Sequence, residues 1–576
     1  MINMQNRGLM AVIVVVMMGC AESQHYVPMF DEADDPVALS TEQEAAWNAV
    51  SEGLNAAWAS ADVRYSRSIV PDCDNIDTLH LTAWRGERVS AQLLVWSSDG
   101  LEDVSCEVGK FYSESATLPA TIAQSRFVRY TLADSTRVGG PAMLSADMLD
   151  VAKSLRVAPR SVRPVWLTID VPEDSQVGVY RSDVVVKCGA EEISLPLTLE
   201  VQPHTLAKPS EWSYHLDLWQ HPTAVARAEG LELWSDAHFE ALRRDMAPLA
   251  NAGQKVVTAT LNKDPWNHQC YDGYEPMICW TLHADGAWSY DYTIFDRWVE
   301  LQFDLGICKM INCYSMVPWN CELEYYDEAQ GEVVTVKAEP GTELFTQMWT
   351  PFLRDFKRHL SDKGWLEITN IAMDERAPEA MDAAVKLLEE CAPEMGFAIA
   401  DMHHSYRRYL NMRDVCVAQE QPADHGDIVS RRAQGYTTTF YICCNPNFPN
   451  TFTRSEPFEA ELLGWYGLAS DYDGMLRWAY NSWPEDPQRD SRFGNWSSGD
   501  TYLVYPYARS SIRFESLRDG IEIAEKVRTL RAKGVDTSEV ERVLEKIRGM
   551  NVNDPTLPWL QTLTEAREAL NAVSRK

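Results

Sequence analysis

The sequence predicts a multidomain protein with an N-terminal antiparallel β-sandwich, a (β/α)8 TIM-type barrel and a C-terminal helical tail. Three observations predict this architecture. The chain has 576 residues, which is more than one ordinary domain holds. Short strand-like runs follow one another at regular spacing over residues 61–205, as in a β-sandwich. Strand-like and helix-like segments then alternate over residues 211–515, as in parallel βα units, and residues 516–576 have helical periodicity.

The first twenty residues have the features of an export signal. Arg7 supplies a short positive region, and the apolar residues 9–18 are too few to span a bilayer. Gly19-Cys20 follows and resembles the end of a bacterial lipobox, so Cys20 is expected to be lipidated and to become the mature amino terminus. The alternative is a signal peptide that is cleaved nearby without lipidation. The expected location is the cell envelope or surface, with membrane attachment only through the lipid anchor.

The predicted sandwich is preceded by a polar segment, residues 21–60, with one helical stretch near residues 41–58. Residues 79–98 form two alternating runs around a polar turn, and this pattern predicts a hairpin. Three further strand-like runs lie at residues 163–172, 178–188 and 191–203. The proline-containing residues 202–209 predict a linker to the barrel.

The predicted barrel has seven clear strands, one fewer than a complete (β/α)8 barrel needs. They are residues 213–220, 254–262, 308–316, 366–373, 397–404, 437–444 and 474–483. Among the helical patterns between them, residues 235–252 begin at a predicted N-cap, Ser235, and another helix opens with Pro378 in its first turn.

Composition excludes several classes of function. The formal net charge is -33, from 85 acidic and 52 basic residues, and such a field repels phosphate backbones, so nucleic acid is not an expected partner. No glycine-rich phosphate loop and no G-x-S-x-G nucleophile elbow occurs. No Cys/His cluster has zinc-site spacing, and no metal or other cofactor is predicted. Of the 13 cysteines, Cys270 and Cys279 flank a short loop and are candidates for a disulfide.

The pair Asp374-Glu375 is the candidate catalytic centre. It ends a strand-like run and precedes a helix, which is how a barrel enzyme places carboxylates at the carboxyl end of a strand. Because neighbouring strand residues point to opposite faces, one carboxylate is expected to face the barrel mouth and the other to lie on its rim. Different surroundings would give the two groups different pKa values and roles. The alternative is a surface pair that caps the next helix.

Other side chains at the predicted strand ends are candidates for substrate binding. They are His215, Asp217, Tyr314, His403, Trp478, Tyr480 and Trp483. Aromatic rings and hydrogen-bonding groups around an acidic pair suit a neutral sugar, because the apolar face of a pyranose packs on an aromatic ring. For each of these residues taken alone, a role in packing is the alternative.

The carboxyl half of the chain resembles glycoside hydrolase family 123, the exo-acting β-N-acetylgalactosaminidases. The resemblance rests on the acidic pair after a strand, on GMLRWAYNSWP at residues 474–484, and on GDTYLVYP at residues 499–506 leading into the helical pattern of residues 510–530. Residues 164–186 are similar to the sandwich that precedes the family's barrel. Relatives often have proline after the acidic pair, where this chain has Arg376.

The resemblance implies retaining, substrate-assisted catalysis, in which the 2-acetamido oxygen of the substrate attacks the anomeric carbon and forms an oxazoline-type intermediate. It assigns Asp374 to orient the acetamido group and stabilise its developing positive charge. It assigns Glu375 to protonate the leaving oxygen and then to activate water. On this basis Asp374 should be ionised, and Glu375 should have the raised pKa. Two alternatives are a β-N-acetylglucosaminidase-like enzyme and a non-catalytic surface carbohydrate-binding protein.

Overall fold

The computed structural model describes residues 30–73 and 76–576. The predicted export signal and Cys20 lie outside the described residues. The fold set out below is that of residues 32–576, which belong to one unit. Within the described part of the chain, no helix is long and apolar enough to cross a membrane.

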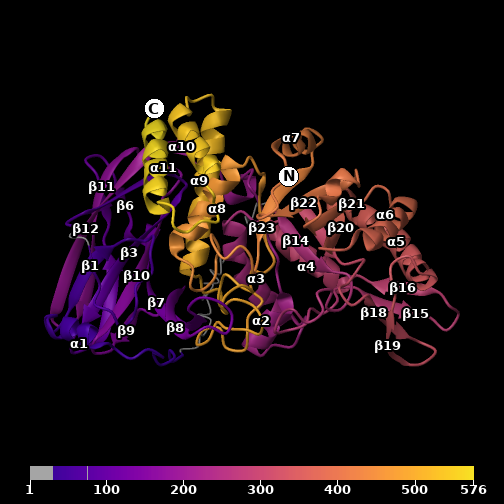
Figure 1. Cartoon of the computed structure of the whole chain (residues 1–576), viewed down its shortest axis with the longest axis horizontal. Coiled ribbons are helices and arrows are strands. Elements are labelled where there is room, and N and C mark those ends of the chain that lie inside the picture. The colour runs from indigo at the N-terminus through magenta and orange to yellow at the C-terminus, as the bar shows by residue number, and fades with distance from the viewer. Residues whose placement is uncertain (1–29, 74–75) are drawn as a thin grey trace, which may run out of the picture. The chain divides into compact units, whose positions relative to one another are not determined.

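Two β-sheets form the N-terminal sandwich, as predicted, and appear in indigo to violet in Figure 1. The first has the order β1-β3-β10-β7-β8, with β1 (Asn55–Ala59), β3 (Arg88–Ser97), β7 (Ala123–Asp134), β8 (Ala142–Leu149) and β10 (Ser161–Asp170). The second has the order β2-β12-β11-β4-β9, with β2 (Leu79–Arg85), β4 (Leu101–Val108), β9 (Ser154–Val157), β11 (Gly178–Cys188) and β12 (Glu191–Thr205), and the short β5 (Phe111–Tyr112) and β6 (Thr117–Leu118) beside them. The pairing is antiparallel except between β2 and β12, which run parallel.

The predicted hairpin over residues 79–98 is wrong, because its two strands belong to different sheets. The chain crosses between the sheets at Gly86, whose φ of +78° is left-handed. A Cβ at this position would lie 2.8 Å from the carbonyl oxygen of Leu206, so the crossover leaves no room for a side chain. The helix expected near residues 41–58 is also shorter: α1 spans Thr41–Asn48 with Ser40 as its N-cap, and Trp58 lies on β1.

Eight parallel strands form the barrel, in the order β13-β24-β23-β22-β21-β20-β17-β14. They are β13 (His215–Leu218), β14 (Val256–Thr260), β17 (Met310–Tyr314), β20 (Thr369–Asp374), β21 (Gly396–Asp401), β22 (Met412–Ala418), β23 (Thr437–Ile442) and β24 (Gly474–Arg477). The strand absent from the prediction is β22, because Arg413 and Asp414 interrupt its apolar run. Asp414 is nevertheless buried.

The barrel closes between β13 and β14 mainly through two glutamine side chains. Backbone pairing there is limited to a bridge between Leu216 and Gln254. The side-chain oxygen of Gln254 accepts from the Leu218 amide at 2.9 Å, and that of Gln220 accepts from the Thr258 amide at 2.8 Å. These amide groups replace ladder hydrogen bonds that the strand backbones do not make.

Helices alternate with the barrel strands, as the fold class predicted. They are α2 (Pro222–Glu229), α3 (Asp236–Asn251), α4 (Thr293–Asp304), α5 (Glu343–Lys363), α6 (Pro378–Cys391), α7 (His425–Ala433) and α8 (Pro457–Ala469). Ser235 caps α3 as expected, accepting from the His238 amide. A small four-stranded sheet that the sequence did not predict lies beside α5, and Trp280 of this sheet stacks on Phe352. Its strands are β15 (Cys279–Leu282), β16 (Trp288–Asp291), β18 (Glu322–Asp327) and β19 (Glu332–Lys337).

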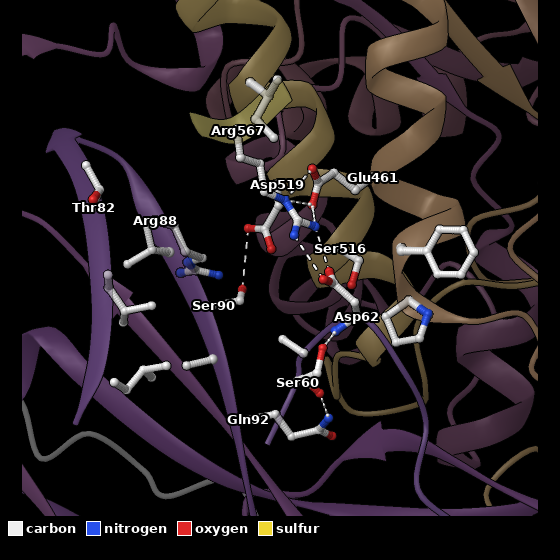
Figure 2. A pocket seen from close by; sticks show the side chains of 18 of the residues that line it. Ser60, Asp62, Thr82, Arg88, Ser90, Gln92, Glu461, Ser516, Asp519 and Arg567 are labelled. Atoms are coloured by element: carbon white, nitrogen blue, oxygen red, sulfur yellow. Dashed lines mark hydrogen bonds and ion pairs between the residues drawn. The ribbon is translucent and has the colours of Figure 1, made fainter. Parts of the chain in front are cut away.

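Of the three C-terminal helices, the first and the last contact the sandwich, and the middle one packs on α8 and on the last helix. The three helices are α9 (Ile512–Ala532), α10 (Ser538–Gly549) and α11 (Trp559–Ser574), drawn in yellow in Figure 1. A pocket of about 450 Å³ lies between the sandwich and these helices. Figure 2 shows Arg567 of α11 donating to Asp62, at 2.6 Å, and to Glu461 of α8. Elsewhere in the wall of this pocket, Ser90 of β3 donates to Asp519 of α9 at 3.4 Å.

A fully buried ion pair joins the sandwich to the start of α9. Asp147 on β8 receives the Arg513 guanidinium at 2.9 Å and that of Arg64 at 3.0 Å. Burial raises the pKa of Asp147, but the two arginines outweigh burial and leave its pKa below the usual value. The opposite edge of Arg513 donates to three backbone carbonyls, of Thr451, Gly499 and Tyr502. One side chain thus connects the sandwich with the loops that follow β23 and β24.

We expect Asp147→Ala to lower the free energy of unfolding by about 3–5 kcal/mol, because it leaves two guanidinium groups buried without their carboxylate. Thermal and urea denaturation measure this change. The matched control is Glu102→Ala, which removes an exposed sandwich ion pair with Arg156 and should cost less than about 1 kcal/mol. Equal losses in the two variants would contradict the role of the buried pair.

Candidate active site

Asp374 and Glu375 both line a pocket of about 130 Å³ at the carboxyl end of the barrel. Asp374 is the last residue of β20, and Glu375 has a left-handed φ of 47°. Its amide donates to the Ala400 carbonyl oxygen at 2.9 Å, which fixes this turn against β21. Strand alternation predicted that one carboxylate would lie on the rim. The left-handed backbone ends that alternation, and both carboxyl groups therefore reach the same pocket.

Indole N–H groups hold the carboxylate of Asp374. Trp319 Nε1 donates to Asp374 Oδ2 at 3.1 Å, and the Trp266 side chain also hydrogen-bonds to this carboxylate. Burial and the neighbouring Glu375 raise the pKa of Asp374 to about 7, and the two indoles offset only part of that rise. From the sequence we expected the raised pKa at Glu375, whereas the structure places a raised pKa at Asp374.

Arg376, which follows the acidic pair, supports Trp319. Its guanidinium lies 4.5 Å from the centre of the indole ring, in cation–π geometry, and Nη1 donates to the Pro318 carbonyl oxygen at 3.3 Å. The positive charge also lowers the pKa of Asp374. Arg376 therefore acts on the acidic pair both through the indole that it covers and through its charge.

Tyr441 is the hydrogen-bond partner of Glu375. Its hydroxyl donates to Glu375 Oε1 from β23, and β22 and β21 lie between β23 and β20 in the barrel. Burial and the Glu375 charge raise the pKa of Tyr441, so the phenol keeps its proton and acts as a donor. The sequence analysis did not select this residue. Strand alternation could have found it, because Thr439, Tyr441 and Cys443 share one face of a predicted strand.

Tryptophan side chains from separate segments form much of the pocket wall. Trp478 follows β24 and meets Trp496 edge-on, with ring centres 5.3 Å apart. Trp478 Nε1 donates to Asp500, which forms a fully buried ion pair with Arg477 at 3.0 Å. The other lining residues are Trp219, Gln269, Trp319, Ala400, Tyr441, Cys443, Cys444 and Leu476. Of the seven predicted binding residues, Trp478 is the one that lines this pocket.

Tyr314 lies beneath the pocket. Its ring packs on Trp219, with centres 4.7 Å apart, and on Trp266 at 5.0 Å. Small side chains surround this aromatic floor at the carboxyl ends of the strands: Ala372, Ala398, Ala400, Cys416 and Ala418. Because these residues are short, the barrel mouth has room for the rings. Tyr314 thus supports the pocket without lining it.

His215 and Asp217 belong to the barrel interior. His215 Nε2 lies 3.6 Å from Asp414, and Asp414 also accepts from the Asn312 side chain at 2.9 Å. Burial and the neighbouring Asp414 raise the pKa of Asp217 well above its usual value. Neither residue lines the pocket, since both lie within β13 and the pocket forms beyond the strand ends.

The structure does not bring His403, Tyr480 or Trp483 to the pocket. His403 is exposed, and its backbone amide donates to Asp401 at 2.8 Å. Tyr480 is buried and donates to the Asp245 carbonyl oxygen at 3.0 Å. Trp483 is buried and donates to the Val504 carbonyl oxygen at 2.6 Å. The predicted last strand ran to residue 483, but β24 ends at Arg477, so the residues beyond follow a loop.

In the described residues, no group of three or more His, Cys, Asp or Glu side chains could hold a metal ion. No disulfide joins two cysteines of the same residues. Cys270 and Cys279, the candidates for a disulfide, are unpaired, the first buried and the second exposed.

The sequence matches the family model described as the glycoside hydrolase 123 catalytic domain over residues 219–530. The chain belongs to glycoside hydrolase family 123. Residues 58–188 match the N-terminal domain of the same family, and the chain is therefore a glycoside hydrolase. No curated protein sequence matches it.

Among solved structures, a family 123 glycoside hydrolase from Clostridium perfringens, described in terms of glycolipid glycan hydrolysis, superimposes with a TM-score of 0.83 at 26% identity. The match covers 91% of this chain and 98% of that one. A GH10 xylanase with a bacterial Ig-like domain from termite gut matches with a TM-score of 0.30 at 10% identity, covering 78% of this chain and 100% of that one.

The raised pKa of Asp374 makes a prediction about stability. The folded protein holds this proton up to about pH 7, whereas an unfolded Asp releases it near its ordinary pKa of 3.8, so ionisation destabilises the fold as pH rises between those values. We expect Asp374→Asn to raise the free energy of unfolding at pH 8 by about 1–3 kcal/mol relative to the parent. At pH 4 the two proteins should differ much less. A stability difference that does not grow between pH 4 and pH 8, measured by thermal denaturation, would contradict this assignment.

Proposed function

We propose that this family 123 enzyme is an exo-acting, retaining β-N-acetylgalactosaminidase that uses substrate-assisted catalysis. The observation that carries the proposal is that Asp374 and Glu375 lie in one small pocket with different partners. Two indole N–H groups hold Asp374, and a phenol holds Glu375. Separate partners keep two adjacent carboxyl groups in separate positions, which suits two separate roles.

In the first step, the acetamido oxygen forms a bond to the anomeric carbon while the bond to the leaving oxygen breaks. Glu375 gives its proton to that oxygen. Asp374 accepts a hydrogen bond from the acetamido N–H, which becomes cationic as the oxazoline ring forms. In the second step, Glu375 takes a proton from water, the water oxygen bonds to the anomeric carbon, and the oxazoline ring opens. Two inversions give net retention.

The raised pKa of Asp374 is consistent with this role. A carboxyl with a pKa of about 7 is costly to ionise in the empty pocket, and a positive charge beside it favours the ionised form. The oxazolinium supplies that charge only as the reaction proceeds. The interaction is therefore stronger in the transition state than with bound substrate, and such a difference is what accelerates a reaction.

The size and walls of the pocket support a terminal sugar as substrate. At about 130 Å³ it is smaller than the roughly 300–1,000 Å³ of sites for drug-sized ligands, so one sugar unit is the fitting occupant. Trp219, Trp478 and Trp496 offer faces on which a pyranose ring can pack. The similar Clostridium perfringens enzyme is described in terms of glycolipid glycans, and we include these glycans among the proposed substrates.

The acetamido group is the decisive feature of the substrate. We expect hydrolysis of the nitrophenyl β-glycoside of N-acetylgalactosamine, release of the β-anomer as first product, and essentially no turnover of the plain β-galactoside. Proton NMR of the nascent product and release of nitrophenol measure these outcomes. Comparable turnover of the 2-hydroxy sugar, or an α-configured first product, would rule out the mechanism. Faster hydrolysis of the N-acetylglucosamine glycoside would instead identify the β-N-acetylglucosaminidase-like alternative, and inertness toward both would favour the binding protein.

Glu375→Gln should slow substrates with poor leaving groups more than activated aryl glycosides. Protonation of the leaving oxygen matters less when that oxygen departs easily, and general acid help amounts to about 10²–10⁴-fold. Steady-state kinetics on an alkyl and a nitrophenyl glycoside give the ratio. The matched control is Asp374→Asn, which should slow both substrates alike because Asp374 acts on the acetamido group. Equal losses for both substrates in Glu375→Gln would refute its role as the acid.

We also propose that the protein is exported and anchored through a lipid on Cys20. The short apolar segment ending in Gly19-Cys20 motivates this proposal. Metabolic labelling with a fatty-acid analogue should mark the parent protein, and Cys20→Ala should abolish the label and release the protein from the membrane fraction. Unchanged membrane attachment of Cys20→Ala would contradict the anchor.

A further inference from the structure

Two adjacent cysteines stand in the wall of the active-site pocket. Cys443 and Cys444 follow β23 directly and line the same pocket as Asp374 and Glu375. Their sulfur atoms lie 3.8 Å apart. Cys444 is exposed and Cys443 is half-buried. We propose that this pair is a reactive dithiol, a site that exchanges with small-molecule disulfides to form a reversible disulfide between the two neighbours and thereby reshapes the pocket.

The local backbone holds both sulfurs at the pocket. The Cys443 amide donates to the Asn445 carbonyl oxygen at 3.0 Å, and the Asn450 side chain donates to the Cys443 carbonyl oxygen at 2.9 Å. These contacts fix the turn that carries the pair. Because neighbouring side chains in an extended strand point to opposite faces, two adjacent cysteines can line one pocket only where the strand has ended, as it has here at Ile442.

The two thiols are chemically unequal. A hydrogen bond between them lowers the pKa of Cys444 and raises that of Cys443. The thiolate is the reactive form, so the exposed Cys444 is the attacking group and Cys443 is the resolving one. In contrast, burial raises the pKa of Cys270 to about 12, as it does that of Cys106. Those buried thiols are therefore poor nucleophiles.

The proposed exchange has two steps. The Cys444 thiolate attacks one sulfur of a disulfide R–S–S–R, forming a mixed disulfide and expelling one thiolate RS⁻. The Cys443 thiol then loses its proton to the expelled thiolate and attacks the Cys444 sulfur, expelling the second RS⁻, which takes a proton from water. Two protein thiols are oxidised to one disulfide, and the small disulfide is reduced to two thiols.

Adjacency makes this disulfide easy to reverse. Consecutive Cα atoms are about 3.8 Å apart, whereas most disulfides join Cα atoms about 4.4–6.8 Å apart. A bond formed outside that range is strained, and strained disulfides are the readily reduced ones. Formation of the disulfide shortens the distance between the two sulfur atoms from 3.8 Å to about 2.0 Å. Cys443 is two residues from Tyr441, the hydrogen-bond partner of Glu375. The wall of the pocket and the position of that phenol should both change.

Native trapping with mass spectrometry tests the chemistry without an activity assay. The reduced full chain is treated with oxidised glutathione, blocked with N-ethylmaleimide and digested. We expect the peptide with Cys443 and Cys444 to lose two hydrogen atoms in mass, at least about tenfold faster than the exposed Cys308 gains a glutathione. Cys443→Ser should stop at the mixed disulfide on Cys444. Equal reaction rates at Cys444 and Cys308, or two glutathiones on the pair, would overturn the proposal.

The effect on the pocket rests on the proposed function and is read separately. Oxidised parent enzyme should have kcat/KM on the N-acetylgalactosaminide reduced at least about fivefold, a difference of about 1 kcal/mol, and dithiothreitol should restore it. For Cys444→Ser, the ratio of reduced to oxidised activity should be close to one, and Cys308→Ser should behave like the parent. A disulfide that forms without changing activity would overturn the link to the pocket. A protein that is inactive in both the reduced and the oxidised state would refute the proposed function, and the mass measurement alone would then decide whether the dithiol reacts as proposed.

Discussion

The buried contact between Asp147 and Arg513 holds the two halves of this protein in register. The carboxylate belongs to the sandwich and the guanidinium to the first turn of α9. The opposite edge of that guanidinium donates hydrogen bonds to backbone carbonyls in the loops after β23 and β24. Those loops carry Trp478 and Trp496 to the pocket. None of the described sandwich residues lines the pocket, yet Asp147 of the sandwich fixes the arginine that orders one wall. The sandwich and the barrel have different sequence patterns, but the buried contact between Asp147 and Arg513 joins them.

The active site places two carboxyl groups side by side at an electrostatic cost that neighbouring residues partly offset. Two adjacent carboxyl groups in an aromatic pocket repel each other and lose their hydration, and the result is the raised pKa of Asp374. The indole of Trp319, braced by Arg376, offsets part of that cost. Arg376 therefore contributes to the electrostatics of the pair. The turn is fixed by the Glu375 amide, which donates to the Ala400 carbonyl oxygen of β21.

Hydrophobic periodicity was enough to predict the sandwich, seven of eight barrel strands and the position of the acidic pair. It failed where tertiary contacts override local pattern. In β22 the charged Asp414 interrupts the apolar run although its side chain is buried. The polar residues around the crossover at Gly86 resemble those of a hairpin turn. Tyr441 was within reach of strand alternation, but Trp496 and Gln269 come from loops, where no period predicts direction, and the cysteine pair lies beyond the end of β23, where alternation no longer holds. Tyr480 and Trp483 were misplaced for the same reason, since the strand ended earlier than its apolar run.

The left-handed backbone at Glu375 has an evolutionary consequence. Residues with a branched or bulky side chain are disfavoured at such a position, and glutamate is held there against a conformational cost. Where a descendant of this fold no longer needs to cleave its sugar, selection no longer maintains glutamate against that cost, and the position should drift to glycine or asparagine. Because these replacements relieve the backbone while deleting the acid, the identity of this one residue should separate working members of the lineage from those that have become lectins.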